Sequence, residues 1–289
     1  MSTEGFNYVQ FVQDLQLRFD ALHQDVANLG LRYRAAKPVP FIVIDDFLPA
    51  WIAEAVWGVF PGREFANWTK LPTEDQKGKY ALADENRMPT EIRGLIHELN
   101  SGSFLRFLEK LTDIPELIAD AKLVGGGLHR IERGGKLSVH VDFSHHPTNR
   151  LNRRLNFLLY LNKDWKEEYG GHFELWNKDI SRCEEKILPI FNRCAIFSTS
   201  PFSYHGHPEP LACPEGVGRS SIALYYFSNG RPAEEEGEHN TLFRSRPGDS
   251  FHASNFVARM ASSGLFRDLM PPLVYRTARK IWNRKFTGA

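Results

Sequence analysis

The chain has 289 residues and a formal net charge of +1, with 42% hydrophobic and 25% charged residues. This composition is that of an ordinary globular protein and excludes one that coats nucleic acid through a strongly basic surface, so we expect no nucleic-acid partner. No run of about 18 apolar residues is present, and the first residues lack an apolar stretch, so we expect neither a transmembrane segment nor a secretory signal. Three cysteines are too few for a disulfide framework and favour a cytoplasmic location.

The first predicted element is a long amphipathic helix over residues 6–29. Apolar residues recur there every three or four positions and Gly30 follows, which is typical of a helix that packs one face and then ends. We assign residues 1–35 to this N-terminal helix. It either packs on the rest of the chain or forms the contact between two copies in a homo-oligomer.

The next elements are shorter. The apolar run at 40–44 predicts a strand, and residues 49–60 and about 90–112 predict helices. The polar stretch 61–88 between these helices is predicted to be irregular.

The middle of the chain has a different pattern, in which short runs rich in Val, Ile, Phe and Tyr alternate with Gly, Pro and Asn. Many short strands without intervening helices indicate a mainly β domain, either a sandwich or a barrel, which we assign to residues 36–230. The predicted strands are 122–131, 136–143, 155–162, 171–176, 187–190, 194–199 and 220–228.

The C-terminal part is divided by charge. An acidic segment at 234–238 is predicted to be a solvated linker, and residues 259–289 carry seven Arg or Lys against one acid. We assign 231–289 to an acidic linker and a basic helical tail. The tail either docks on the more acidic remainder of the chain or contacts an anionic membrane surface or a partner.

The strand at 136–143 carries the first candidate metal ligands. Because side chains alternate along a strand, His140 and Asp142 share one face and can turn toward one point. They supply two members of the 2-His-1-carboxylate set that binds non-haem Fe(II). A His-x-Asp alone is weak, since it is as readily the solvent face of a strand.

The third ligand has to come from a distant strand. The stretch after the strand at 194–199 offers both His205 and His207. We favour His205, because it lies nearer the strand end and precedes Gly206, which allows a close backbone approach.

Two other strands carry candidates for binding an anion. Arg219 opens a core strand, where an unpaired guanidinium is costly, and its planar fork suits a carboxylate. On the strand at 155–162, Asn156, Leu158 and Tyr160 share a face. Tyr160 can therefore offer its hydroxyl to the carboxylate that Arg219 holds.

In these residues the sequence resembles the Fe(II)- and 2-oxoglutarate-dependent oxygenases, in particular the prolyl 4-hydroxylase-like branch. The resemblance runs from about 122 to 228 and rests on five ordered motifs. They are His140-Val-Asp142, Phe157-Leu-Leu-Tyr-Leu-Asn-Lys-Asp-Trp165, Gly170-Gly171, Tyr204-His205-Gly206 and Arg219-Ser-Ser221.

The resemblance implies a double-stranded β-helix (jelly roll) with helices at both ends. It implies that His140, Asp142 and His205 bind iron, and that Arg219 holds 2-oxoglutarate, with hydrogen bonds from Tyr160 and Ser221. The implied reaction uses O2 and releases succinate and CO2 while hydroxylating an unactivated C–H bond. Ascorbate is a candidate reductant. The implied substrate is a peptidyl or small molecule, and desaturation or ring closure stay open as outcomes.

Two rival functions share this scaffold. A cupin-like metalloprotein with non-oxidative chemistry leaves Arg219 and Tyr160 unexplained, and a non-catalytic jelly-roll module leaves the histidines unexplained. We expect substrate specificity to come from the segments 61–88 and 143–153. His145 and His146 either form a surface pair, which we favour, or touch the substrate. Arg153 and Arg154 either are charges at a strand start, which we favour, or meet an acidic substrate.

Overall fold

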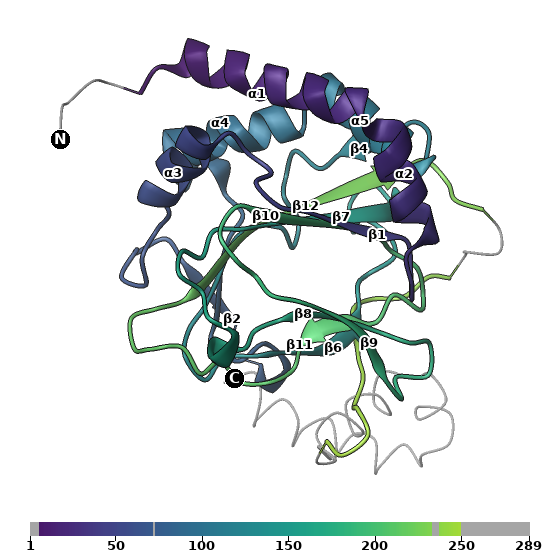
Figure 1. The fold of residues 1–289 in the computed structure, drawn as a ribbon. Coiled ribbons are helices and arrows are strands. Elements are labelled where there is room, and N and C mark those ends of the chain that lie inside the picture. The colour runs from purple at the N-terminus through teal and green to yellow at the C-terminus, as the bar shows by residue number, and fades with distance from the viewer. Residues whose placement is uncertain (1–5, 72, 233–236, 250–289) are drawn as a thin grey trace. The chain divides into compact units, whose positions relative to one another are not determined.

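The computed structural model describes residues 6–71, 73–232 and 237–249. Two antiparallel sheets face one another, and the helices cover the outer face of the larger sheet (Figure 1). The helices are α1 (Tyr8–Gln24), α2 (Val26–Ala35), α3 (Ala50–Gly58), α4 (Thr90–Leu99) and α5 (Gly102–Thr112), with the 3-10 turns η1 (Glu74–Gln76), η2 (Glu85–Arg87) and η3 (Glu167–Tyr169).

The larger sheet has the strand order β1-β10-β7-β12-β5-β3-β2, and β4 pairs with β12 beside this path. Its strands are β1 (Phe41–Ile44), β2 (Thr69–Leu71), β3 (Lys79–Leu82), β4 (Ile118–Ala119), β5 (Gly127–Ile131), β7 (Asn152–Tyr160), β10 (Arg193–Ser198) and β12 (Arg219–Ser228).

The smaller sheet has the order β13-β6-β11-β8-β9. Its strands are β6 (Leu137–Val141), β8 (Phe173–Trp176), β9 (Cys183–Ile187), β11 (His205–His207) and β13 (Leu242–Phe243). The predicted mainly β fold, a double-stranded β-helix with helices before it, is confirmed. The predicted C-terminal helices and the basic tail lie outside the described residues.

The predicted N-terminal helix is present but is divided in two. It breaks at Asp25, and α2 then runs through Gly30 to Ala35 instead of ending at the glycine. A Cβ at Gly30 would lie 3.2 Å from the Leu111 carbonyl oxygen of α5. The glycine therefore marks a close approach between two helices, which from sequence alone is indistinguishable from a helix end.

Several other predicted boundaries were wrong. The helix expected over about 90–112 is two helices, because Ser101 caps α5 by accepting a hydrogen bond from the Phe104 amide. The stretch 61–88 contains β2 and β3, which extend the larger sheet. The strand expected at 187–190 ends at Ile187.

The core lies between the helices and the larger sheet. On β7 the side chain of Phe157 packs between α5 and the loop after β1, with ring centroids 5.7 Å from Phe104 and 5.3 Å from Phe47. The alternate residues Asn156, Leu158 and Tyr160 face the smaller sheet and line a cavity. One face of the sheet thus packs the core while the other is left for the site.

Two further features bear on the sequence-based expectations. All three cysteines are free thiols. Within the described ranges, no helix combines the length and the apolar content needed to cross a membrane. Most of the predicted acidic linker falls outside the description, although Glu238 forms an exposed ion pair with Arg150 at 2.6 Å.

Candidate active site

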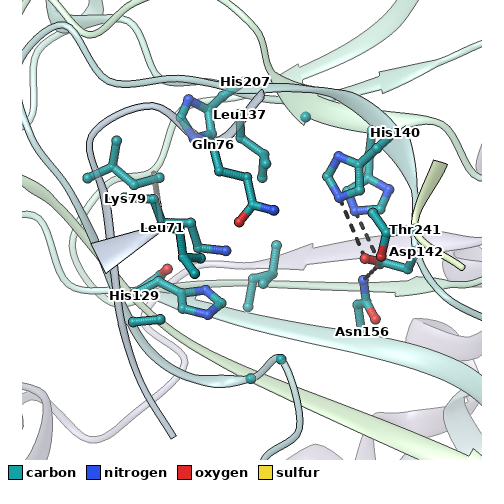
Figure 2. A pocket seen from close by; sticks show the side chains of 18 of the residues that line it. Leu71, Gln76, Lys79, His129, Leu137, His140, Asp142, Asn156, His207 and Thr241 are labelled. Carbon is teal, nitrogen blue, oxygen red and sulfur yellow. Dashed lines mark hydrogen bonds and ion pairs between the residues drawn. The ribbon is translucent and has the colours of Figure 1, made fainter. Parts of the chain in front are cut away.

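A cavity of about 430 Å³ lies between the two sheets. This volume falls in the range of small-molecule sites. Its polar lining comes from both sheets and from the segment around η1 (Figure 2). The polar residues are Thr69, Gln76, Lys79, His129, His140, Asp142, Arg153, Asn156, Tyr160, His205, His207, Arg219, Ser221, Tyr225 and Thr241.

His140, Asp142 and His205 come together at one side of this cavity. Their candidate ligand atoms all lie within 4.8 Å of one another. The Nε2 atom of His140 is 3.5 Å from Asp142 Oδ1, and the Nε2 atom of His205 is 3.3 Å from Asp142 Oδ2. These are the three residues that the sequence analysis selected, and His205 rather than His207 completes the cluster.

The backbone fixes the orientation of both imidazoles. His140 Nδ1 lies 2.9 Å from the Ser138 carbonyl oxygen, and His205 Nδ1 lies 2.8 Å from that of Ser203. A carbonyl oxygen only accepts, so each ring donates from Nδ1 and turns the lone pair of Nε2 into the cavity. Two imidazole lone pairs and a carboxylate are the donor set of an open non-haem Fe(II) site, so these residues fit that metal.

A bulge between β6 and β11 permits this geometry. His205 pairs with His140 and His207 pairs with Leu137, so the register shifts by one residue between them. At Gly206, between the two histidines, a Cβ would lie 2.8 Å from the Leu137 carbonyl oxygen and 3.0 Å from that of Ser138. Only a glycine allows these strands to approach so closely, as the sequence suggested.

Arg153 and Asn156 hold the Asp142 carboxylate. The Arg153 guanidinium lies 3.0 Å from Asp142 Oδ2, and Asn156 donates to the same oxygen from Nδ2 at 2.7 Å. Arg153 also donates to Asn156 Oδ1 from two nitrogens, at 2.9 and 2.7 Å. Burial alone raises the pKa of Asp142, but Arg153 and the two imidazoles outweigh it and hold that pKa well below its ordinary value.

Arg153 is buried and is held by two aromatic rings. Its guanidinium carbon lies 3.4 Å from the ring centroid of Tyr225 and 4.5 Å from that of Phe143. Arg153 does lie at the start of β7, as interpreted from the sequence, but it is buried there and contacts Asp142. Strand alternation places it on the helix side with Phe157, but a register shift between β7 and β12 turns it into the cavity.

Tyr160, Arg219 and Ser221 form another part of the cavity wall. The Arg219 guanidinium carbon is 4.9 Å from the Tyr160 ring centroid, and Arg219 Nε donates to the Gly171 carbonyl oxygen at 2.8 Å. Ser221 lies opposite Tyr160 in the β12–β7 register. Within the described chain the Tyr160 hydroxyl has no hydrogen-bond partner, and burial raises its pKa. A buried hydroxyl beside a buried guanidinium fits a carboxylate, and hence 2-oxoglutarate.

His146 lies near these residues in the sequence but outside the cavity. His146 is buried, 3.5 Å from Asp120, and its Nδ1 accepts from the amides of Thr148 and Asn149, so the surface interpretation was wrong for it. It stabilises the loop after β6 and does not line the cavity.

Lys79, His129 and His207 line the side of the cavity away from the metal cluster. Figure 2 shows them opposite His140 and Asp142. Burial lowers the pKa of Lys79 to about 8 and holds the pKa values of His129 and His207 well below the ordinary histidine value. From the sequence, His207 was considered only as the alternative third metal ligand, and Lys79 and His129 had no predicted role, because no local pattern links β3, β5 and β11.

Residues 126–227 match the family described as the 2OG-Fe(II) oxygenase superfamily. This part of the chain, which carries all three candidate iron ligands, is therefore similar to a 2OG-Fe(II) oxygenase domain. The match supports the resemblance predicted from the sequence, and the family's description names Fe(II) and 2-oxoglutarate.

A curated relative matches a shorter part of the chain. Prolyl 3-hydroxylase OGFOD1 of Mus musculus is 30% identical over 79 residues, which are 26% of this chain and 14% of that protein's length. The chain thus spans a small part of this relative.

Solved structures also resemble the domain. Prolyl 4-hydroxylases from Phytophthora capsici superpose with a TM-score of 0.50 at 18% identity, covering 79% of this chain and 68% of that one, and share its fold. A prolyl hydroxylase from Trichoplax adhaerens, bound to a peptide of a hypoxia inducible factor, gives a TM-score of 0.47 at 21% identity, covering 74% of this chain and 92% of that one.

Proposed function

We propose that the protein is an Fe(II)- and 2-oxoglutarate-dependent dioxygenase that hydroxylates an unactivated C–H bond and releases succinate and CO2. His140, Asp142 and His205 would hold the iron, and Arg219, Tyr160 and Ser221 the distal carboxylate of 2-oxoglutarate. The observation that carries this proposal is that one cavity holds two separate features. One is a His-Asp-His group that could bind a metal, and the other is a buried guanidinium beside a buried hydroxyl.

Each residue has a distinct task in this proposal. The iron and 2-oxoglutarate supply the oxidising chemistry when they are bound. The Ser138 and Ser203 carbonyls keep both imidazoles turned toward the metal position. Arg153 keeps Asp142 ionised and oriented, so the carboxylate is ready to bind metal without losing a proton.

The substrate class follows from the family only in outline. We propose a peptidyl or small-molecule substrate, with proline as one candidate, since the relatives include prolyl hydroxylases. Desaturation and ring closure stay open as outcomes of the same chemistry. We also propose that the protein is cytoplasmic and uses ascorbate as a reductant. Two further hypotheses are that the protein forms a homo-oligomer and that its basic C-terminal tail is a docking segment.

The test is succinate release from purified protein supplied with Fe(II), 2-oxoglutarate and O2. We expect a slow release without substrate, which disappears when iron is omitted or a chelator is added. Iron content and 2-oxoglutarate binding, measured on the same sample, separate the rivals. A cupin-like enzyme of other chemistry binds metal but not 2-oxoglutarate, and a non-catalytic module binds neither.

A further inference from the structure

The wall of the cavity opposite the metal cluster carries a second group of polar side chains. This group, called here the Lys79 cluster, consists of Lys79 on β3, His129 on β5, His207 on β11 and Gln76 in η1. Figure 2 shows Gln76 pointing between the other members of the cluster and His140. The cluster therefore faces the space in which a substrate bound at the metal would lie.

Lys79 and His207 lack partners among the described residues, whereas His129 forms a hydrogen bond with the Gly125 backbone. His207 is 3% exposed, and neither of its ring nitrogens has a hydrogen-bond partner in the part of the chain that the structure describes. Lys79 forms no ion pair with any described residue. Buried polar groups in this condition are costly unless a ligand satisfies them.

The charge of the cavity indicates which ligand. Lys79, Arg153 and Arg219 are cations among its described lining residues, whereas Asp142 is the single carboxylate there and is paired with Arg153. Iron adds two positive charges and 2-oxoglutarate two negative ones, so the loaded cavity would keep a net charge of +2, of which Lys79 carries one on the wall opposite the metal. An anionic group on the substrate would neutralise it.

The Lys79 cluster is separate from the 2-oxoglutarate site. Arg219 pairs with Ile131, and Ile131 pairs with Lys79, so Arg219 and Lys79 lie two strands apart. At the usual strand spacing this is about 10 Å between their Cα atoms. Tyr160 lies on β7, on the opposite side of β12, so the carboxylate held by Arg219 and Tyr160 is turned away from Lys79.

We propose that Lys79, His207 and Gln76 bind a carboxylate of the substrate and thereby select acidic molecules. The inference rests on the proposed function, since it places the other end of the substrate at the metal. Lys79 supplies one positive charge, and the His207 imidazole and the Gln76 amide supply hydrogen-bond donors, while His129 is held by the Gly125 backbone and completes the wall beside them. Because Lys79 is the single cation of the cluster, it suits a singly charged carboxylate better than a phosphate dianion.

The test uses the full chain loaded with 2-oxoglutarate and with Mn(II) in place of Fe(II), so that no turnover occurs. The probes are matched pairs, glucuronate with glucose and propionate with propionamide, together with inorganic phosphate. Binding near Mn(II) broadens the proton signals of the organic probes, and calorimetry gives the affinities. We expect the acids to bind and their proton signals to broaden. Their neutral partners should bind at least about tenfold more weakly than the acids.

The variants separate a charge effect from a folding effect. Lys79→Met should weaken acid binding by roughly tenfold or more, whereas Lys79→Arg should retain most of it. Lys77→Met is the matched control, because Lys77 is an exposed cation two residues away and does not line the cavity. It should bind the acids as the natural sequence does.

Several results would overturn the inference. They are equal binding of acids and neutral partners, no binding of any acid, a preference for phosphate, or acid binding that Lys79→Met leaves unchanged. If 2-oxoglutarate affinity falls as far in Lys79→Met as in Arg219→Met, Lys79 belongs to the 2-oxoglutarate site instead. Failure of the proposed function gives a different result, the absence of Mn(II) and 2-oxoglutarate binding. Repeating the acid titrations on metal-free protein keeps the two failures distinct.

Discussion

The guanidinium of Arg153, on β7 of the larger sheet, lies 3.0 Å from the carboxylate of Asp142, which directly follows β6 of the smaller sheet. The pair joins the two sheets at the metal position. Asp142 therefore meets a cation before any metal arrives, and its orientation is set by the protein.

Replacing this partner should weaken metal binding without removing a ligand. We expect Arg153→Met to lower the affinity for Mn(II) by about 10- to 100-fold, the usual cost of losing an outer partner of a ligand. Arg150→Met is the control, because Arg150 is an exposed cation in the loop just before β7. A metal titration that gives equal affinities for both variants would show that Asp142 needs no such support.

Alanine variants of the two histidines of β11 should differ in their affinity for metal. His205→Ala removes a candidate ligand, so we expect metal affinity to fall by at least roughly 100-fold. His207→Ala should leave metal affinity nearly unchanged, because His207 faces the other side of the cavity. The measurement is Mn(II) titration of each purified variant, and the opposite order would exchange their roles.

Substitution of Arg219 should lower the affinity for 2-oxoglutarate but not the affinity for metal. A hydrogen bond to a charged group contributes about 1.5–3 kcal/mol, so Arg219→Met should raise the 2-oxoglutarate dissociation constant roughly 10- to 100-fold. Metal affinity measured in the absence of 2-oxoglutarate should stay within a few fold. An unaltered 2-oxoglutarate titration would remove Arg219 from this role.

Gly206 should be intolerant of any side chain. The Cβ in Gly206→Ala would press on backbone oxygens of β6, and overpacking of this kind costs about 1–3 kcal/mol. We expect a lower Tm and weaker metal binding, since both histidine strands move apart. Gly58→Ala is the control, because nothing lies within 4 Å of the added carbon. Equal Tm values would show that β6 and β11 can relax.

Acid binding should depend on pH through Lys79. Its pKa of about 8 lies below the ordinary 10.5, so affinity for glucuronate should fall as the pH rises from about 7 to about 9 and Lys79 loses its proton. Lys79→Arg should abolish the dependence, and calorimetry at each pH checks both. The charged and titratable groups that face Lys79 are Asp142, Arg153, Arg219, His129 and His207.

The same shift has a consequence for stability, with a defined sign. The folded protein binds the Lys79 proton less tightly than the unfolded chain does. The free energy of unfolding that this group contributes therefore rises between about pH 8 and the ordinary pKa of 10.5. Lys79→Met should flatten that rise in a pH series of denaturant titrations.

Local alternation made the metal cluster predictable from the sequence. His140 and Asp142 share a strand face, and Asn156 and Tyr160 share another, so one strand pattern was enough for each pair. The position of the Arg153 side chain in the cavity could not be predicted, because a register shift between β7 and β12 turns it to the other face of the sheet. Bulges of this kind leave no simple pattern in a single sequence. Lys79, His129 and His207 meet only through pairing of distant strands, which no local pattern encodes. The hairpin of β2 and β3 escaped because its residues are mainly polar.

The β2–β3 hairpin, which carries Lys79 and Gln76, lies outside the part of the chain that matches the oxygenase family. It precedes residues 126–227, the part that matches the oxygenase family, while all three candidate iron ligands fall inside that part. If Lys79 selects acidic substrates as proposed, substitutions in the hairpin would change which molecules bind while leaving the three candidate iron ligands in place.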